Sequence, residues 1–196
     1  MSYIDGPYST SAADAAHPEL WEHLAGAWAP CLGPSGAILF DRSGYGNHGT
    51  LKNFTLDAAW PVSDGRRSIL TDGTNDYVSF GTALSGLNAN FTACMWIRSS
   101  AIAVNDFLLG TYNTTSGAVG WAIRANSGDD LGISTGSAGG FTNDTYSPVT
   151  NTNDGLWHFV AFVCDLGGTS GAMYYSANEG AAPVADPVNF GGHGIT

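Results

Sequence analysis

Short β-type segments separated by turn residues constrain this chain more than any other feature of its sequence. From Leu20 onward, runs of branched and aromatic residues are interrupted by Gly, Asn and Asp at intervals of about 8 to 12 residues, as in antiparallel sandwiches and barrels. The strands that this pattern predicts are residues 27–28, 68–70, 77–80, 91–99, 107–112, 121–125, 131–135, 157–165 and 172–176.

The composition excludes a helical bundle. The chain of 196 residues contains 27 glycines, but it has a single lysine, Lys52, and three glutamates. Glycine is thus about twice as frequent as usual, and the straight-chain charged residues that cover most helices are nearly absent. We therefore expect one all-β domain.

Two predicted strands are expected to carry the core. Residues 91–98 alternate between an apolar face and a face that is only half polar and includes Trp96, so we expect this strand to be covered on both faces. Residues 157–164 are apolar on both faces apart from His158, as in a central strand of a two-layer sandwich. Residues 126–129 are typical of a hairpin turn.

Charge, hydropathy and cysteine spacing exclude several classes of partner. Seventeen acidic and six basic residues give a net charge of -11, which repels a phosphate backbone and predicts no nucleic-acid partner. The apolar stretches are far shorter than the roughly 20 residues of a membrane helix. Cys31, Cys94 and Cys164 include no C-x-x-C pair, which argues against a disulfide framework and a zinc site. The first residues show no secretory signal, so we expect synthesis in a cytoplasm.

Four blocks of the sequence follow the order found in a known family. Residues 26–28 and 40–51 are GAW and FDRSGYGNHGTL, residues 71–78 are TDGTNDYV, residues 91–97 are FTACMWI, and residues 153–161 are NDGLWHFVA. These blocks resemble the laminin-G-like, concanavalin-A-like jelly-roll modules of bacterial and phage proteins. The resemblance implies an all-β jelly-roll sandwich of two antiparallel sheets over residues 20–196. Residues 1–19, which lack strand alternation, are expected to form an extended N-terminal arm.

The end of the chain departs from the pattern of this family. Modules of this type generally close with a strand that lies beside the opening strand, here residues 27–28. No such segment follows residues 172–176, where the remaining sequence is rich in Gly and Pro. We therefore expect a jelly roll without its last strand, an opening strand that is bare or completed by a partner, and an oligomeric assembly. The alternatives are a sequence that is incomplete at its C-terminus, or residues 1–19 folded back over the exposed edge.

Residues 72–76 supply a candidate metal site. Asp72, Asn75 and Asp76 place three oxygen-bearing side chains just before a predicted strand, and Ca²⁺ prefers carboxylate and amide oxygens. The resemblance to calcium-binding jelly rolls supports this interpretation, whereas a plain turn capped by Asp76 is the alternative. The segment 41–49 has two similar interpretations, a rigid loop or a ligand contact through Asp41 or Asn47.

Four aromatic residues near predicted loops are candidates for ligand binding, because aromatic rings stack on the apolar faces of sugars. They are Trp60, Tyr112, Trp121 and Tyr146. For Trp60 and Trp121, a packing role is the alternative. The polar segment 142–154 is expected to be a long loop.

The sequence predicts no enzymatic activity. Glycoside hydrolysis normally needs two carboxyl groups that flank the scissile bond, and no predicted strand carries acidic residues at alternate positions. The Gly-x-Ser-x-Gly pattern that surrounds the serine nucleophile of many hydrolases is also missing.

The favoured function is a non-enzymatic structural and binding module on the surface of a virus or phage particle, as a capsid decoration or fibre. An acidic lectin-like chain without an export signal fits a virion protein, which assembles in the host cytoplasm together with other virion proteins or like subunits. The alternative is a calcium-dependent carbohydrate-binding module of a bacterial surface or secreted protein, with a cell-surface glycan as its ligand. A small glycan hydrolase ranks third, since this fold serves many functions.

Overall fold

The computed structural model describes residues 21, 23–30, 36–101, 106–112, 120–125, 130–137, 140–147, 152–166, 171–176 and 180–185. Contacts divide the chain into two compact units, Met1–Leu84 and Ser85–Thr196. The predicted arm at residues 1–19 and the predicted turn at residues 126–129 lie outside the described residues. Among the described residues, no helix is long and apolar enough to cross a membrane.

The first unit contains a small sheet and a hairpin. The sheet has the order β1-β2-β5, and the hairpin pairs β3 with β4. Their bounds are Ile38–Leu39 for β1, Gly49–Lys52 for β2, Val62–Ser63 for β3, Arg66–Arg67 for β4 and Tyr77–Ser79 for β5. Leu39, Leu51, Ala59 and Trp60 form the buried core of this unit.

The β3–β4 hairpin replaces the strand predicted at residues 68–70. Its two-residue turn consists of Asp64 and Gly65, which both have positive φ angles of 53° and 75°. Asp-Gly is a preferred sequence for such a turn because both residues tolerate this backbone conformation. The turn therefore fixes the strand pairing just before residues 68–70.

The opening strand at residues 27–28 is paired within the chain. Trp28 forms an antiparallel bridge with Asp41. The Ala27 amide donates to Asp41 Oδ1 at 2.9 Å, and the Arg42 amide donates to the Ala27 carbonyl at 2.8 Å. The expectation of a bare opening strand is therefore wrong for Ala27, because residues 41–42 lie beside it and pair with it. The oligomeric assembly stays a prediction.

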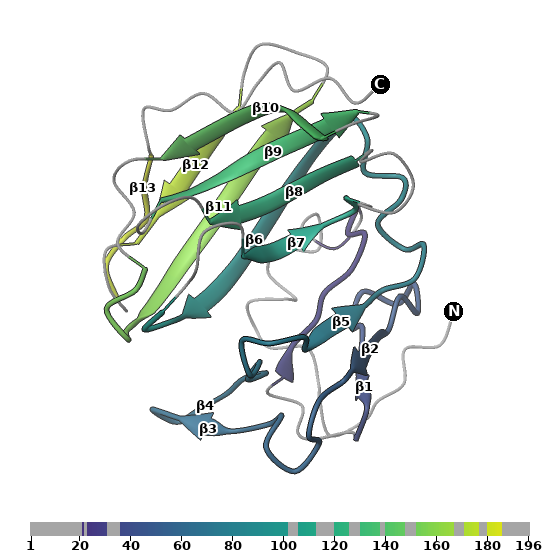
Figure 1. The fold of residues 1–196 in the computed structure, drawn as a ribbon, viewed down its shortest axis with the longest axis vertical. Helices are drawn as coiled ribbons and strands as arrows, with labels where there is room; N and C mark the ends of the chain where they lie inside the picture. The colour runs from purple at the N-terminus through teal and green to yellow at the C-terminus, as the bar shows by residue number, and fades with distance from the viewer. Residues whose placement is uncertain are drawn as a thin grey trace. The chain divides into compact units, whose positions relative to one another are not determined.

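The second unit is a sandwich of two antiparallel four-stranded sheets, as Figure 1 shows. One sheet has the order β10-β9-β8-β7 and the other has the order β13-β12-β11-β6. The bounds are Asn90–Arg98 for β6, Phe107–Gly110 for β7, Gly120–Ala125 for β8, Leu131–Ser137 for β9, Gly140–Ser147 for β10, Trp157–Asp165 for β11, Ala172–Tyr175 for β12 and Val184–Ala185 for β13. The predicted two-sheet sandwich is confirmed.

Alternating side chains from both sheets fill the space between the layers. Phe91 on β6 packs against Trp121 on β8, with ring centroids 4.3 Å apart, and Phe162 on β11 is fully buried. The buried core consists of Phe91, Trp121, Ile123, Ala125, Leu131, Ile133, Val160, Phe162, Cys164, Leu166, Met173 and Tyr175. Burial of this apolar surface is the main favourable contribution to folding of the unit.

Two strands of the second unit differ from the sequence prediction. β10 occupies much of the segment 142–154 that was expected to be a loop, and β13 follows β12 where no strand was expected. Both are outermost strands among the described ones. Outermost strands do not need the apolar patterning of central strands, which is why composition alone indicated loops.

Candidate binding site

One face of the β13-β12-β11-β6 sheet points away from the core of its unit, and we call it the outer face. Its side chains lie in the alternate positions of the strands whose other positions fill the core. They are Thr92, Cys94 and Trp96 on β6, Phe159, Ala161 and Val163 on β11, and Tyr174 on β12. Trp96 is 43% exposed and Tyr174 is 37% exposed. The expectation that residues 91–98 are covered on both faces is therefore wrong at Trp96.

The strand register arranges this face in rows. Trp96 lies opposite Phe159, and their rings meet edge to face with centroids 5.6 Å apart. In the next row, Cys94 lies opposite Ala161, which in turn lies opposite Tyr174. Small side chains thus form a floor beside the Trp96–Phe159 pair, and Tyr174 lies on the same floor.

A shallow hollow of about 300 Å³ lies at the end of β6 and β11. Its side-chain lining on the outer face comes from Asn90, Thr92, Val163 and Asp165. Phe91 and Cys164 also line it, although their side chains belong to the core on the other face of the sheet. Polar groups therefore adjoin an apolar platform on one sheet surface.

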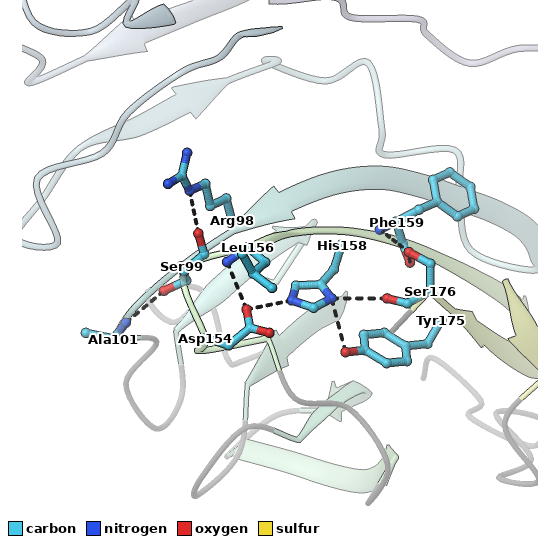
Figure 2. A network of polar contacts seen from close by, with 10 residues as sticks. Arg98, Ser99, Ala101, Asp154, Leu156, His158, Phe159, Tyr175 and Ser176 are labelled. Atoms are coloured by element: carbon cyan, nitrogen blue, oxygen red, sulfur yellow. Dashed lines mark hydrogen bonds and ion pairs between the residues drawn. The ribbon is translucent and has the colours of Figure 1, made fainter. Parts of the chain in front are cut away.

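A buried histidine braces the strands that carry the outer face. His158 on β11 has no exposed surface, and Figure 2 shows it between the 154–156 segment and the end of β12. Its Nε2 lies 2.8 Å from Asp154 Oδ1, and its Nδ1 lies 3.0 Å from the Ser176 carbonyl oxygen. The Tyr175 hydroxyl is a further neighbour of Nδ1 at 3.1 Å. Both nitrogens of this buried ring therefore have hydrogen-bond partners.

Asp154 is the acidic partner of this histidine. Burial alone would raise the pKa of Asp154, but the His158 hydrogen bond, the Leu156 amide and the His158 charge outweigh burial and hold this pKa below 3.8. The neighbouring Gly155 is bonded to the end of β6 and to the residue after it: Arg98 Nε donates to its carbonyl at 2.7 Å, and its amide donates to the Ser99 carbonyl at 2.8 Å. The network therefore ties β6, β11 and β12 together at one end.

The structure corrects two of the four predicted ligand-binding aromatics. Trp121 has no exposed surface and packs in the sandwich core. Trp60 is 8% exposed in the core of the first unit, where its Nε1 donates to the Gly36 carbonyl at 3.0 Å. Neither ring offers a face to a sugar, because each is the large side chain around which a core packs.

The other two predicted aromatics lie on different strands of the second unit. Tyr112 follows β7, is half-buried and stacks on Phe107, with ring centroids 6.0 Å apart. Tyr146 lies on β10, and its side chain is outside the described part of the structure. Their role in ligand binding remains a prediction.

The structure places Asp72, Asn75 and Asp76 together in a turn before β5. Asp72 Oδ1 accepts hydrogen bonds from the Thr74 and Asn75 amides at 2.8 and 3.4 Å, and Asp76 Oδ2 accepts one from the Asp72 amide at 3.0 Å. Among the described residues, no three His, Cys, Asp or Glu side chains form a cluster that could hold a metal ion. Ca²⁺ takes six to eight oxygen ligands, so these three side chains would supply only part of its coordination. The hydrogen bonds support the turn interpretation.

The segment 41–49 is a rigid loop organised by one carboxylate. Asp41, which is 9% exposed, accepts four hydrogen bonds, from the Ala27, Ser43 and Asn47 amides and from the Ser43 hydroxyl, at 2.7 to 2.9 Å. Burial alone would raise the pKa of Asp41, but these hydrogen bonds hold it below 3.8. All the acceptor positions of the carboxylate are thus occupied, which confirms the rigid-loop interpretation.

Sequence reasoning missed the outer face as a candidate site. The alternation of Thr92, Cys94, Trp96 and Arg98 was visible, but it was interpreted as a second buried face. The mixed polarity of these four positions is the signal that could have identified an exposed surface, since buried faces of sandwiches rarely carry Arg.

Comparisons with known proteins agree with this architecture. A family model described as concanavalin A-like lectin/glucanases superfamily, Laminin_G_3, matches residues 72–187, which is more than half of the chain. No curated protein gives a significant match. The crystal structure of an S-layer domain-containing protein from Clostridium thermocellum ATCC 27405 has a similar fold, with a TM-score of 0.53 and 20% identity over 78% of this chain and 69% of that chain. The chain therefore belongs to the concanavalin A-like lectin/glucanase superfamily, as a laminin-G-like module.

Proposed function

We propose that this chain is a non-enzymatic binding module that holds an extended glycan on its outer face. The observation that carries the proposal is the exposure of Trp96 and Tyr174 beside the small side chains of Cys94 and Ala161. Aromatic rings next to a flat floor suit the apolar faces of pyranose rings. β6 has nine residues, so the face extends over roughly 27 Å, long enough for several sugar units in a row.

Charge and chemistry favour a glycan over other ligands. The net charge of -11 disfavours nucleic acids and other strongly anionic partners. The outer face also has hydrogen-bonding side chains, Asn90 and Thr92, beside its aromatic platform. A sugar chain uses both kinds of contact, because each ring has apolar C–H faces and a rim of hydroxyl groups.

The absence of catalysis is part of the proposal. Asp41 and Asp154 hold low pKa values through structural hydrogen bonds, so neither is available as a protonated general acid near neutral pH. We expect no release of reducing ends from a panel of β-glucans and galactans. Release that is lost on a single Asp substitution would contradict this part of the proposal.

Substitution of Trp96 tests the proposed binding face. Trp96→Ala should lower the affinity for a bound oligosaccharide at least about tenfold, equivalent to 1.4 kcal/mol, because a central aromatic anchor is lost. Binding is measured by isothermal titration calorimetry with oligosaccharides selected on a glycan array. The matched control is Tyr77→Ala, which removes a ring that is 54% exposed on β5 of the first unit. Equal losses in the two variants, or no loss in either, would contradict the proposal.

The location of the module is a separate part of the proposal. The sequence favours the surface of a virus or phage particle, with like subunits or other virion proteins as neighbours. The bacterial cell surface is supported by the similar fold in a protein that is named for its S-layer domain. Copurification of the native protein with particles supports the first location, and its recovery with the cell envelope supports the second.

Calcium binding at Asp72, Asn75 and Asp76 is a further proposal with its own test. It is supported by Asp76 Oδ1, which is buried and has no hydrogen-bond partner among the described residues. A buried carboxylate oxygen costs free energy unless a donor or a cation meets it. If Ca²⁺ binds there, millimolar calcium should raise the thermal midpoint by a few degrees relative to excess chelator. Identical midpoints under the two conditions would leave the segment as a turn only.

A further inference from the structure

We infer that the hollow at the Asn90 end of the outer face is a subsite for one uncharged pyranose residue and rejects acidic sugars. The inference rests on the proposed function, because it assigns one end of the same glycan. The aromatic platform contacts any pyranose in a similar way, so it does not by itself choose between sugars. The side chains of the hollow are different, and they supply the selectivity.

The strand register builds this hollow as a square of four side chains. Asn90 lies directly opposite Asp165, and Thr92 lies directly opposite Val163. Facing side chains of an antiparallel pair have Cβ atoms about 4.5 to 5.5 Å apart. Together with Phe91 and Cys164, these four residues line an open hollow of about 300 Å³, at the lower end of the range for small-molecule sites.

The floor of the hollow is fixed by the core beneath it. Phe91 and Cys164 lie between the four side chains in sequence and point into the sandwich core, where they are 9% and 1% exposed. The pairing of β6 with β11 continues one residue beyond both strands, where the Leu166 amide donates to the Ala89 carbonyl at 3.2 Å. Leu166 is itself 1% exposed in the core. A backbone held in this way keeps the hollow in shape before a ligand arrives, which lowers the entropic cost of binding.

Each side chain has a distinct role toward a sugar. The exposed Asn90 amide both donates and accepts hydrogen bonds, and the exposed Thr92 hydroxyl does the same, so they match hydroxyl groups on a pyranose. Val163, which is 38% exposed, offers an apolar wall to ring C–H groups. The carboxylate of Asp165 places a negative charge beside the ligand, and the net charge of -11 has the same sign. A uronic acid or sulfated sugar would meet like charge there, and such repulsion creates specificity.

The test compares neutral oligosaccharides with the same oligosaccharides oxidised to uronic acids at C6. The wild-type chain should bind neutral members at least about tenfold more tightly than their oxidised forms. Thr92→Val keeps the shape of the side chain but removes the hydroxyl, and Asn90→Ala removes the amide. Each should weaken binding of the neutral ligand about fivefold or more, since each loses a hydrogen bond of about 1 kcal/mol. Asp165→Asn removes the charge and should reduce the preference against oxidised ligands by a similar factor.

The outcomes separate this inference from the proposed function. If Trp96→Ala loses binding while the Asn90, Thr92 and Asp165 variants match the wild type in affinity and preference, the subsite is wrong and the binding face stands. If the wild type binds neutral and oxidised ligands equally, the subsite is also wrong. If no oligosaccharide binds, or Trp96→Ala binds as well as the wild type, the proposed function fails and the subsite fails with it. Thermal midpoints of all variants show whether a lost affinity is a folding defect.

Discussion

Replacement of His158 by alanine should lower the free energy of unfolding of the second unit by about 3 to 5 kcal/mol. The side chain is fully buried, and both ring nitrogens are within 3.0 Å of an acceptor. Its removal leaves a cavity and takes away the ring that contacts Asp154, Tyr175 and the Ser176 carbonyl. Urea denaturation followed by tryptophan fluorescence and far-UV circular dichroism measures the change.

A milder variant separates the charge of this network from its packing. Asp154→Asn keeps an oxygen that accepts the hydrogen bond from Nε2 but removes the carboxylate charge. The Asp154 side chain is 28% exposed, so solvent screens the pair and we expect a clearly smaller loss of stability than for His158→Ala. A His158→Ala protein that unfolds at the wild-type urea concentration would show that the network contributes nothing to the fold.

Replacement of Asp41 by asparagine should destabilise the first unit by about 2 to 4 kcal/mol. Four donors converge on this carboxylate, and an asparagine side chain turns an NH₂ group toward some of them. We also expect the packing of Trp28 to be disturbed. The opening strand is joined to the loop by the Ala27 amide, and Trp28 Nε1 donates to the Asn47 carbonyl at 2.7 Å. Asp57→Asn is the matched control, since Asp57 is an exposed acid of the same unit.

The pH dependence of stability gives the same residue a second signature. The pKa of Asp41 in the folded chain lies below its ordinary value of 3.8, so the ionised form is favoured by folding. Its stabilising contribution is complete above about pH 4 and is lost as the pH falls through the folded pKa. The wild type should therefore lose stability in acid more steeply than Asp41→Asn. Thermal midpoints are measured for both proteins from neutral pH to about pH 2.5. Midpoints that fall equally with pH in the two proteins would contradict this account.

The central strands could be predicted from the sequence because their pattern is strong. Residues 157–165 are apolar almost throughout and match β11 residue for residue, and the alternation of residues 91–98 places β6 within one residue. The short strands β1 and β2 were missed, because two to four residues carry too little periodicity to stand out from a loop. The Asp64–Gly65 hairpin was a missed turn signal that the sequence did contain.

The candidate site was harder to predict than the strands, for a physical reason. Alternation shows that Trp96 and Trp121 each lie on one face of a strand, but it does not show what lies beyond that face. Trp121 faces the second sheet and is buried, whereas Trp96 faces outward and is 43% exposed. The Asp41 loop was easier, since a dense run of Gly, Ser and Asn around one Asp already indicates that the carboxylate serves the local backbone.

The faces of the β6–β11 pair also determine how its two thiols respond to oxidation. Cys164 points into the core, where burial raises the pKa of its thiol to about 12 and keeps it unreactive, whereas Cys94 is exposed on the outer face. Thiols on opposite faces of a sheet cannot be joined by a disulfide without moving the backbone. An oxidising environment would thus add no cross-link between them, and of these two thiols Cys94 would be the one to form a sulfenic acid or a mixed disulfide. That adduct would stand on the floor beside Trp96, so oxidation of Cys94 is expected to obstruct the outer face.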